Sequence, residues 1–303
     1  MGILYNLNKL FLNLCSRNII KINDEKYLRL LYKFKMHSKL DLKNPKSFNE
    51  KLQWLKLNDR NNNYTTMVDK YQVKQYVANI LGKEYIIPTL GIYNKFDEID
   101  FDKLPNKFVI KCTHDSGGVI IVKDKKVFDK KAAKKKISKK LKFNYYYSCR
   151  EWPYKNVKPR IIVEQYLKND NGKELPDYKF FCFNGKVKMI LVCSNRKGNY
   201  KNTNFYDTNW NLLPFTRKSH NNSLKIIERP HNLEEMINIA ENLAKNIPFI
   251  RVDLYEVNNK VFFGELTFYP SSGFEGFNPD EWDKILGDML ELPNNKEEEK
   301  NEK

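Results

Sequence analysis

The sequence predicts an α+β fold, and three patterns along the chain support this class. Apolar residues recur at helical spacing in the N-terminal part, helical and β-rich stretches alternate from residue 64 onward, and residues 249–268 alternate like a β-hairpin. With 303 residues, of which 41% are hydrophobic, the chain can bury one large core or two modest ones. A purely disordered or fibrous protein is therefore excluded.

Residues 1–62 are predicted to form a helical N-terminal region. Its first helix is amphipathic, because one face carries Ile3, Leu4, Leu7, Leu10, Phe11 and Leu14. That face either packs onto the rest of the protein or docks peripherally on a membrane. Two further helices are expected over residues 24–36 and 49–58. The region is too short for a sheet domain of its own.

Two α+β lobes are predicted to follow, over residues 63–167 and 168–293. The first is expected to contain a helix at 65–81, an apolar stretch at 85–92, strands at 108–113 and 119–122, a basic helix at 129–141 and a strand at 160–166. The second is expected to contain strands at 178–183, 187–194 and 203–207, a helix at 233–246 and the hairpin at 249–268. The charged residues 294–303 are predicted to be a disordered tail.

The overall composition limits the partners and the compartment. Basic residues outnumber acidic ones by 54 to 37, a net charge of +17 spread along the whole chain, which favours anionic partners or solvated basic faces. The five cysteines form no CxxC pair, which argues against a disulfide framework or a zinc site. No stretch approaches the roughly 20 apolar residues of a membrane span, and no signal peptide is evident. We therefore expect a cytoplasmic protein; if the first helix docks on a membrane, it would do so at the inner face.

Two carboxylates lie near the open end of the predicted C-terminal hairpin. Asp253 belongs to its first strand and Glu265 to its second. A three-residue loop over 257–259 would place both on one face, whereas a two-residue turn would place them on opposite faces. Paired carboxylates on one face suit Mg²⁺, which prefers oxygen ligands and bridges substrate phosphates. A water-exposed polar face is the alternative.

A second candidate site joins a lysine strand to a glycine loop. The strand 108–113 contains Lys111, and the loop that follows holds Ser116, Gly117 and Gly118. Backbone N–H groups of such a loop can close over phosphate oxygens, and the nearby lysine adds charge. An ordinary hairpin turn is the alternative, and the loop is no Walker A motif.

The strand 160–166 carries an acid in an apolar run. Glu164 follows Ile161, Ile162 and Val163, and a core strand would not tolerate it unpaired. The strand either offers backbone groups to a flat base or leaves the core for solvent at this point.

Taken in this order, the three stretches resemble an ATP-grasp enzyme. The resemblance is carried by the Lys111 strand with its glycine loop, by Val163-Glu164-Gln165-Tyr166-Leu167, and by Arg251-Val252-Asp253 with Gly264-Glu265-Leu266-Thr267; an Asp69-Lys70 helix precedes them. The runs Ser47–Lys56 and Glu265–Phe274 are similar to the TupA-like branch, which is associated with teichuronopeptide and other surface-polysaccharide biosynthesis. The resemblance covers residues 45–292. It implies an ATP-grasp fold, in which two α+β lobes enclose the nucleotide, with a short helical N-terminal region in front.

The resemblance also implies a role for each matching residue. The nucleotide would be held by Lys70, Lys111, Ser116, Gly117, Gly118, Glu164, Gln165, Tyr166, Leu167 and, as a weaker candidate, Lys188. Mg²⁺ would be held by Asp253, Glu265 and Thr267, and Arg251 and Lys179 would be catalytic. Many relatives have Asn where this chain has Thr267, and a hydroxyl is a poorer oxygen donor than an amide carbonyl.

The implied reaction is an ADP-forming ligation that needs ATP and Mg²⁺. A carboxylate, such as an amino acid or a sugar acid, would become an acyl phosphate and then be attacked by an amine or hydroxyl of a polysaccharide-linked acceptor. Nucleic acid is not an expected partner. Two alternatives stay open: a glycosyltransferase whose Asp253 and Glu265 hold a metal-bound nucleotide sugar, and a basic protein that binds polyanions. His114 is either a loop residue at the surface or part of the site.

Overall fold

The computed structural model describes residues 2–170, 172, 175–194, 202–219 and 227–293. The predicted tail 294–303 lies outside this part of the chain. The helices are α1 (Gly2–Ser16), α2 (Asp24–Met36), α3 (Phe48–Asn58), α4 (Asn63–Val68), α5 (Gln72–Leu81), α6 (Lys130–Leu141), α7 (Tyr146–Cys149), α8 (Leu233–Ala244) and α9 (Trp282–Asp288). The strands are β1 (Thr89–Tyr93), β2 (Phe108–Cys112), β3 (Val119–Val122), β4 (Ile161–Gln165), β5 (Asp177–Phe183), β6 (Lys186–Ser194), β7 (Asn202–Tyr206), β8 (Thr216–Arg217), β9 (Phe249–Val257), β10 (Lys260–Thr267) and β11 (Phe277–Asn278).

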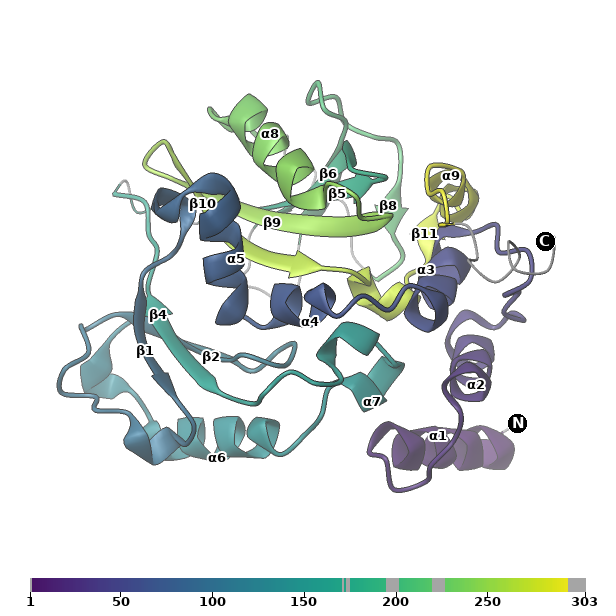
Figure 1. Ribbon diagram of the computed structural model, residues 1–303, viewed down its shortest axis with the longest axis horizontal. Helices are drawn as coiled ribbons and strands as arrows, with labels where there is room; N and C mark the ends of the chain where they lie inside the picture. Colours follow the sequence, from purple (N-terminus) through teal and green to yellow (C-terminus); the bar gives the residue numbers. More distant parts are fainter. Residues whose placement is uncertain (1, 171, 173–174, 195–201, 220–226, 294–303) are drawn as a thin grey trace, which may run out of the picture.

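Two antiparallel sheets dominate the structure, which confirms the predicted α+β class. The smaller sheet has the strand order β1-β4-β2-β3, and the larger has the order β10-β9-β5-β6-β7. Helix α6 packs against the smaller sheet, and α8 packs against β5, β6 and β9 of the larger one (Figure 1). Each sheet is thus covered by a helix on one face, as the amphipathic patterns of these segments require.

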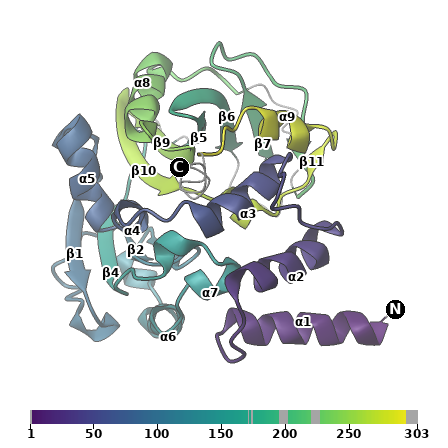
Figure 2. The same ribbon diagram turned by 45° about the vertical axis from the view of Figure 1, so that its right-hand side comes forward.

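The division into cores differs from the division expected along the sequence. Strands β2 and β4 pack with α6 in a smaller core around Phe108, Ile110 and Ile137. Helices α4 and α5 belong instead to the core of the larger sheet, through residues such as Met67 and Val77. The segment 63–167 therefore contributes to both cores, and α4 and α5 lie between the two sheets (Figure 2).

The helix expected over residues 65–81 is interrupted, and the sequence prediction was wrong at this point. Helix α4 ends at Val68 and α5 begins at Gln72. The buried Asp69 carboxylate accepts the backbone N–H of Tyr71 at 2.9 Å and that of Gln72 at 3.4 Å, in the turn that leads into α5. The backbone N–H of Lys70 bonds to the carbonyl oxygen of Thr113 at 3.1 Å. The break thus ties Lys70 to the end of β2.

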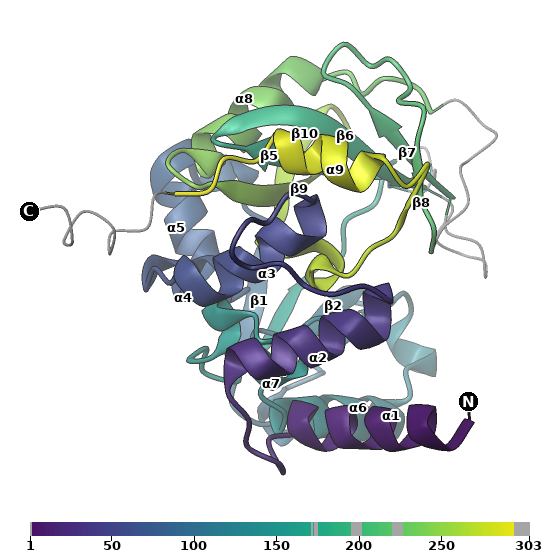
Figure 3. The ribbon, with the colours of Figure 1, turned by 90° about the vertical axis from the view of Figure 1, so that its right-hand side faces the viewer.

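The first two helices pack along one side of the molecule. The hydroxyl of Tyr27 in α2 donates to the carbonyl oxygen of Ser148 in α7 at 2.8 Å, and Leu12 and Cys15 of α1 are buried in the same cluster. Figure 3 shows α1 below α2, at the same end of the protein as α6. Among the described helices, none combines the length and apolarity needed to cross a membrane.

Candidate active site

The β9–β10 hairpin places Asp253 and Glu265 side by side, but by a route that the sequence did not predict. The turn has two residues, Asn258 and Asn259, both with positive φ, which suits a tight hairpin turn. Such a turn alone would put the carboxylates on opposite faces. A bulge at Gly264 brings the two carboxylates back to the same face. The register shifts between Phe263 and Glu265, so Glu265 becomes the direct partner of Asp253.

The space around Gly264 explains why this position is a glycine. A Cβ atom built there would lie 2.9 Å from the carbonyl oxygen of Asp253 and 3.0 Å from the ring of Tyr255. Any larger residue would push the two strands apart at the bulge. A three-residue loop over 257–259 was the expected cause of the shared face; the cause is instead this bulge, five residues beyond Asn259.

The neighbouring strands extend this pair into a row of charged side chains. Lys179 of β5 is the register partner of Asp253, so Lys179, Asp253 and Glu265 cross three adjacent strands on one face. Arg251 lies two residues before Asp253 and faces Thr267 across the hairpin. The residues in between, such as Val252, point to the opposite face and pack in the core with α8.

Arg251 holds this row together. Its Nε atom lies 2.6 Å from Oδ1 of Asp253, and its second guanidinium nitrogen contacts Asp253 at 2.7 Å, Glu265 at 3.1 Å and the hydroxyl oxygen of Thr267 at 3.0 Å. Lys179 bonds to Asp253 and, at 2.7 Å, to Asp177. The planar guanidinium donates several bonds at fixed angles, so it orients both carboxylates.

The pKa shifts follow from these contacts. Burial raises the pKa of Asp253 to about 6, against the opposing effect of Arg251 and Lys179. Burial would also raise the pKa of Glu265, but Lys70, Arg251 and further lysines outweigh it and lower the pKa to about 2. The side chain of Glu265 is 42% exposed, and that of Asp253 is 2% exposed. Glu265 therefore presents a carboxylate to the site at every physiological pH.

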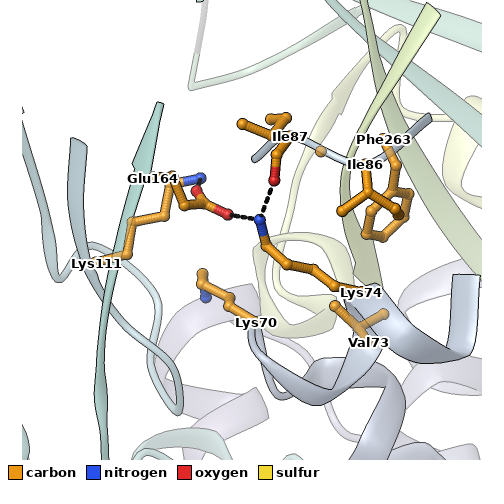
Figure 4. A pocket seen from close by; sticks show the side chains of 9 residues that line it. Lys70, Val73, Lys74, Ile86, Ile87, Lys111, Glu164 and Phe263 are labelled. Atoms are coloured by element: carbon orange, nitrogen blue, oxygen red, sulfur yellow. Dashed lines mark hydrogen bonds and ion pairs between the residues drawn. The ribbon is translucent and has the colours of Figure 1, made fainter. Parts of the chain in front are cut away.

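Lys111 reaches this region from β2 of the smaller sheet, and Lys70 reaches it from the break between α4 and α5. Both line a pocket with Glu164 from β4 and with Phe263 and Gly264 from β10 (Figure 4). Residues packed with both sheets thus bound the pocket, and Lys70, Lys111 and Glu164 meet in it. Gln165, Tyr166 and Leu167 do not line it; the backbone N–H of Gln165 donates to the carbonyl oxygen of Pro88 at 3.0 Å.

Glu164 is buried and paired, so its strand does not leave the core at this point. Its two oxygens contact Nζ of Lys74 and Nζ of Lys111, each at 2.5 Å, and these two cations lower its pKa despite the opposing effect of burial. Lys74 also donates to the carbonyl oxygen of Ile87 at 2.6 Å. Glu164 therefore positions Lys111 by its side chain.

The glycine loop lies next to Lys70. The Nζ atom of Lys70 donates to the carbonyl oxygen of Asp115 at 2.6 Å, and Ser116 and Gly117 are exposed. Gly118 is buried, and a Cβ atom there would come within 2.5 Å of the Asp115 carboxylate. The loop can thus expose two residues to a phosphate while Gly118 closes against Asp115.

His114 is neither a surface residue nor directed at the site. Its ring is buried, and Nε2 lies 3.2 Å from the carbonyl oxygens of Lys140 and Phe143. Burial lowers the pKa of this imidazole. The side chain anchors the glycine loop to the end of α6.

Lys188 lies apart from the row. Lys188 lies in β6 and is exposed, at the point where the register with β5 shifts between Phe181 and Cys182. The β6 residue that pairs with Lys179 is Leu191, three positions further along. The structure therefore does not bring Lys188 to Asp253 and Glu265.

Sequence reasoning missed Lys74 and the pair formed by Asp69 and Arg160. Lys74 completes the contacts of Glu164, and Arg160 bonds to Asp69 at 2.6 Å where α5 begins. One signal was present for Lys74: a buried acid requires a cation, and Lys74 follows Lys70 by four residues. Nothing in the local sequence connects Asp69 with Arg160, which are 91 residues apart.

The donor types suit a hard divalent cation, which would replace contacts that Arg251 and Lys179 make with the two oxygens of Asp253. Asp253 and Glu265 supply carboxylate oxygens from paired positions, and Thr267 adds a hydroxyl on the same face. Within the described ranges, no group of three or more His, Cys, Asp or Glu side chains is arranged to hold a metal alone. A cation bound here would therefore need oxygens from a substrate, which is the usual way in which Mg²⁺ binds with phosphates.

Solved structures with a related arrangement are distant from this chain. They include the D-alanine–D-alanine ligase from Bacillus anthracis complexed with ATP, at 19% identity and TM-score 0.42 over 74% of this chain and 65% of that one. The D-alanine–D-alanine ligase from Helicobacter pylori has 15% identity and TM-score 0.39 over 88% and 69%. An ATP-grasp RimK domain protein from Sphaerobacter thermophilus has 10% identity and TM-score 0.40 over 75% and 69%. The chain thus spans just under two thirds of the length of the Bacillus anthracis ligase.

The family comparison is more direct. No curated protein matched the chain. The family described as TupA-like ATPgrasp matches residues 50–291, which include the Lys111 strand, the glycine loop, β4 and the β9–β10 hairpin. The chain belongs to the TupA-like ATP-grasp family.

Proposed function

We propose that this protein is an ADP-forming ligase that uses ATP and Mg²⁺ to activate a carboxylate as an acyl phosphate. The acceptor would be an amine or hydroxyl on a cell-surface polysaccharide or its precursor. Membership of the TupA-like ATP-grasp family supports the ATP-dependent class. The carboxylate, the acceptor and the polysaccharide role are the parts that need direct experiment.

One observation carries the proposal: cations from both lobes surround a carboxylate pair. Arg251 contacts Glu265 at 3.1 Å and Lys179 bonds to Asp253 on the larger sheet, while Lys111 of β2 and Lys70 from the break between α4 and α5 line the adjoining pocket. All four cations lower the pKa of Glu265. Because Lys111 also pairs with Glu164 and Lys179 with Asp177, acids largely balance these cations, and a polyphosphate bound here would need a metal ion beside it. A protein that only binds polyanions would have no need for the two oriented acids.

The residues of the chain have distinct tasks in this reaction. Lys111, held by Glu164, and Lys70, held at the glycine loop, would bind phosphate oxygens. Asp253 and Glu265 would hold Mg²⁺, which when bound offsets repulsion among the phosphate oxygens. Arg251 would stabilise the charge that develops on the transferred phosphoryl group.

The bonds balance without a further reactant. A carboxylate oxygen of the substrate attacks the γ-phosphorus of ATP, the bond to the bridging oxygen breaks, and ADP leaves. The acceptor then attacks the acyl carbon and loses a proton, and inorganic phosphate departs. The enzyme contributes positioning and electrostatic stabilisation, as is usual for phosphoryl transfer.

The test is to incubate the purified protein with ATP, Mg²⁺ and a panel of amino acids and sugar acids, and to separate ADP, AMP and UDP. Release of ADP that one carboxylate stimulates is the expected result. Release of AMP would contradict the acyl-phosphate route. Turnover of a nucleotide sugar without ATP consumption would instead support a glycosyltransferase.

A further inference from the structure

Helix α1 has a second apolar face, which points away from the protein. Leu12 and Cys15 are buried against α2 and α7, yet Leu7 and Leu10 are 59% and 58% exposed. At 100° per residue, Leu7, Leu10 and Leu14 form one stripe, about 140° around the helix from the buried side. A helix that only covers its own domain would carry polar residues on this stripe.

Helix α6 has a basic face that also points outward. Its buried residues, Ala133 and Ile137, pack toward β2. The opposite face carries the exposed Lys131, Lys135 and Lys139, and the exposed Lys142 follows as the C-cap residue. Other lysines of this helix are engaged within the protein; Lys134, for example, pairs with Asp97 at 2.7 Å.

The two outward faces look in the same direction. In all three ribbon views, which differ only by rotation about the vertical axis, α1 and α6 lie at the lower end of the molecule (Figures 1, 2 and 3). In Figure 1, α2 and α7, against which α1 packs, and β2, against which α6 packs, lie above these two helices. The apolar stripe and the four lysines therefore belong to one surface, which we call the α1/α6 face.

We propose that the α1/α6 face docks on an anionic phospholipid bilayer. Helix α1 would lie in the plane of the interface with Leu7 and Leu10 among the upper acyl carbons, and the α6 lysines would meet anionic headgroups. Charge complementarity favours lipid over a second copy of the chain, because a two-fold pairing through this face would bring two basic α6 helices together. This inference does not depend on the proposed reaction.

The test is vesicle flotation with the full chain, on phosphatidylcholine vesicles with and without phosphatidylglycerol. Binding is expected only with phosphatidylglycerol, and it should weaken as salt rises. The double variant Leu7→Asn/Leu10→Asn should reduce the vesicle partition coefficient by at least about tenfold, since both side chains leave water on docking. The triple variant Lys131→Gln/Lys135→Gln/Lys139→Gln should do the same and lose the response to phosphatidylglycerol.

Matched controls change the same residue types on other elements. Ile80→Asn/Leu212→Asn removes two apolar side chains that are 45% and 56% exposed, and Lys186→Gln/Lys245→Gln/Lys284→Gln removes three lysines. Both controls should bind vesicles as the wild type does, and the thermal unfolding midpoint should be unchanged in every variant.

Three results would overturn the proposal. The first is an absence of vesicle binding by the wild type at low salt. The second is wild-type binding by the Leu7→Asn/Leu10→Asn variant, which would reduce the face to a general polyanion surface. The third is a wild-type dimer in sedimentation that this variant dissociates, which would make the face a contact between copies.

Discussion

Glu265 and Lys111 are expected to act in different states of the reaction: Glu265 in the transition state and Lys111 already in the ground state. Glu265 is the exposed carboxylate of the pair, and Lys111 is a cation held against Glu164. Because a metal contact to the phosphates strengthens in the transition state, Glu265→Gln should lower carboxylate-stimulated ADP release by at least about a hundredfold, close to 3 kcal/mol. Nucleotide affinity should change much less.

Lys111→Ala should weaken nucleotide binding as well as turnover, since its charge contacts the ground-state phosphates. Calorimetric titration with a non-hydrolysable ATP analogue, beside ADP release, separates the two variants. Glu281→Gln, an exposed acid beside α9, is the control and should retain wild-type values for both measurements. Wild-type turnover in Glu265→Gln would rule out the metal assignment.

Lys56 connects stability to pH. Its side chain is fully buried, and Nζ donates to Gln53 and to the carbonyl oxygen of Ser272, both at 2.8 Å. Burial lowers its pKa from 10.5 to about 8. Between these two values the unfolded chain retains a proton that the folded protein has released, so this group raises the free energy of unfolding as pH increases, by at most about 3 kcal/mol.

Lys56→Met removes this titration. The free energy of unfolding of the wild type, minus that of the variant, should therefore rise between about pH 8 and pH 10.5 in urea titrations. Lys245→Met, at an exposed position, should give a flat difference over this range. A flat difference for Lys56→Met would show that the buried amine does not titrate in this window.

At the scale of the element, the hairpin depends on its bulge more than on its turn. A Cβ atom at Gly264 would meet the Asp253 backbone at 2.9 Å, so Gly264→Ala should destabilise the protein by about 1–3 kcal/mol and displace Glu265. Asn259→Gly retains the positive φ of the turn and should change stability by less than about 0.5 kcal/mol. Urea unfolding and ADP release measure both effects.

A stable Gly264→Ala variant with normal turnover would show that Glu265 does not need this register. Asn259→Gly tests the turn separately. A large loss of stability in this variant would mean that the turn, and not the bulge, sets the pairing of β9 with β10.

At the scale of the whole molecule, the site joins two cores. The pocket contains Lys111 from the smaller sheet and Phe263 from the larger one, so a nucleotide bound there would contact both. Binding of an ATP analogue with Mg²⁺ should slow amide hydrogen exchange in β2 and β4 and also in β9 and β10, since a ligand stabilises the elements that it contacts. Hydrogen exchange with mass spectrometry is the measurement. Protection confined to one sheet would mean that the nucleotide does not bridge the lobes.

The sequence by itself determined the α+β class, most of the helices and strands, and the family. These follow from local periodicity and from motifs of a few residues, because a strand or an amphipathic helix is specified by its own neighbours along the chain. The alternation around Asp253 and Glu265 also identified both carboxylates as candidates. Their roles, like those of Lys70, Lys111 and Arg251, stay predictions until the variants are measured.

The tertiary structure decided what depends on contacts between distant segments. At the bulge, a Cβ atom on residue 264 would meet the backbone of Asp253 and the ring of Tyr255, and no pattern within β10 shows that crowding. The break between α4 and α5 depends on Asp69, which Arg160 contacts from 91 residues away. Glu164 tolerates burial only because Lys74 and Lys111 converge on it from two other elements. The electrostatic stabilisation of a buried acid depends on the distance in space to a cation. The fold sets that distance, and the separation of the two residues along the sequence does not.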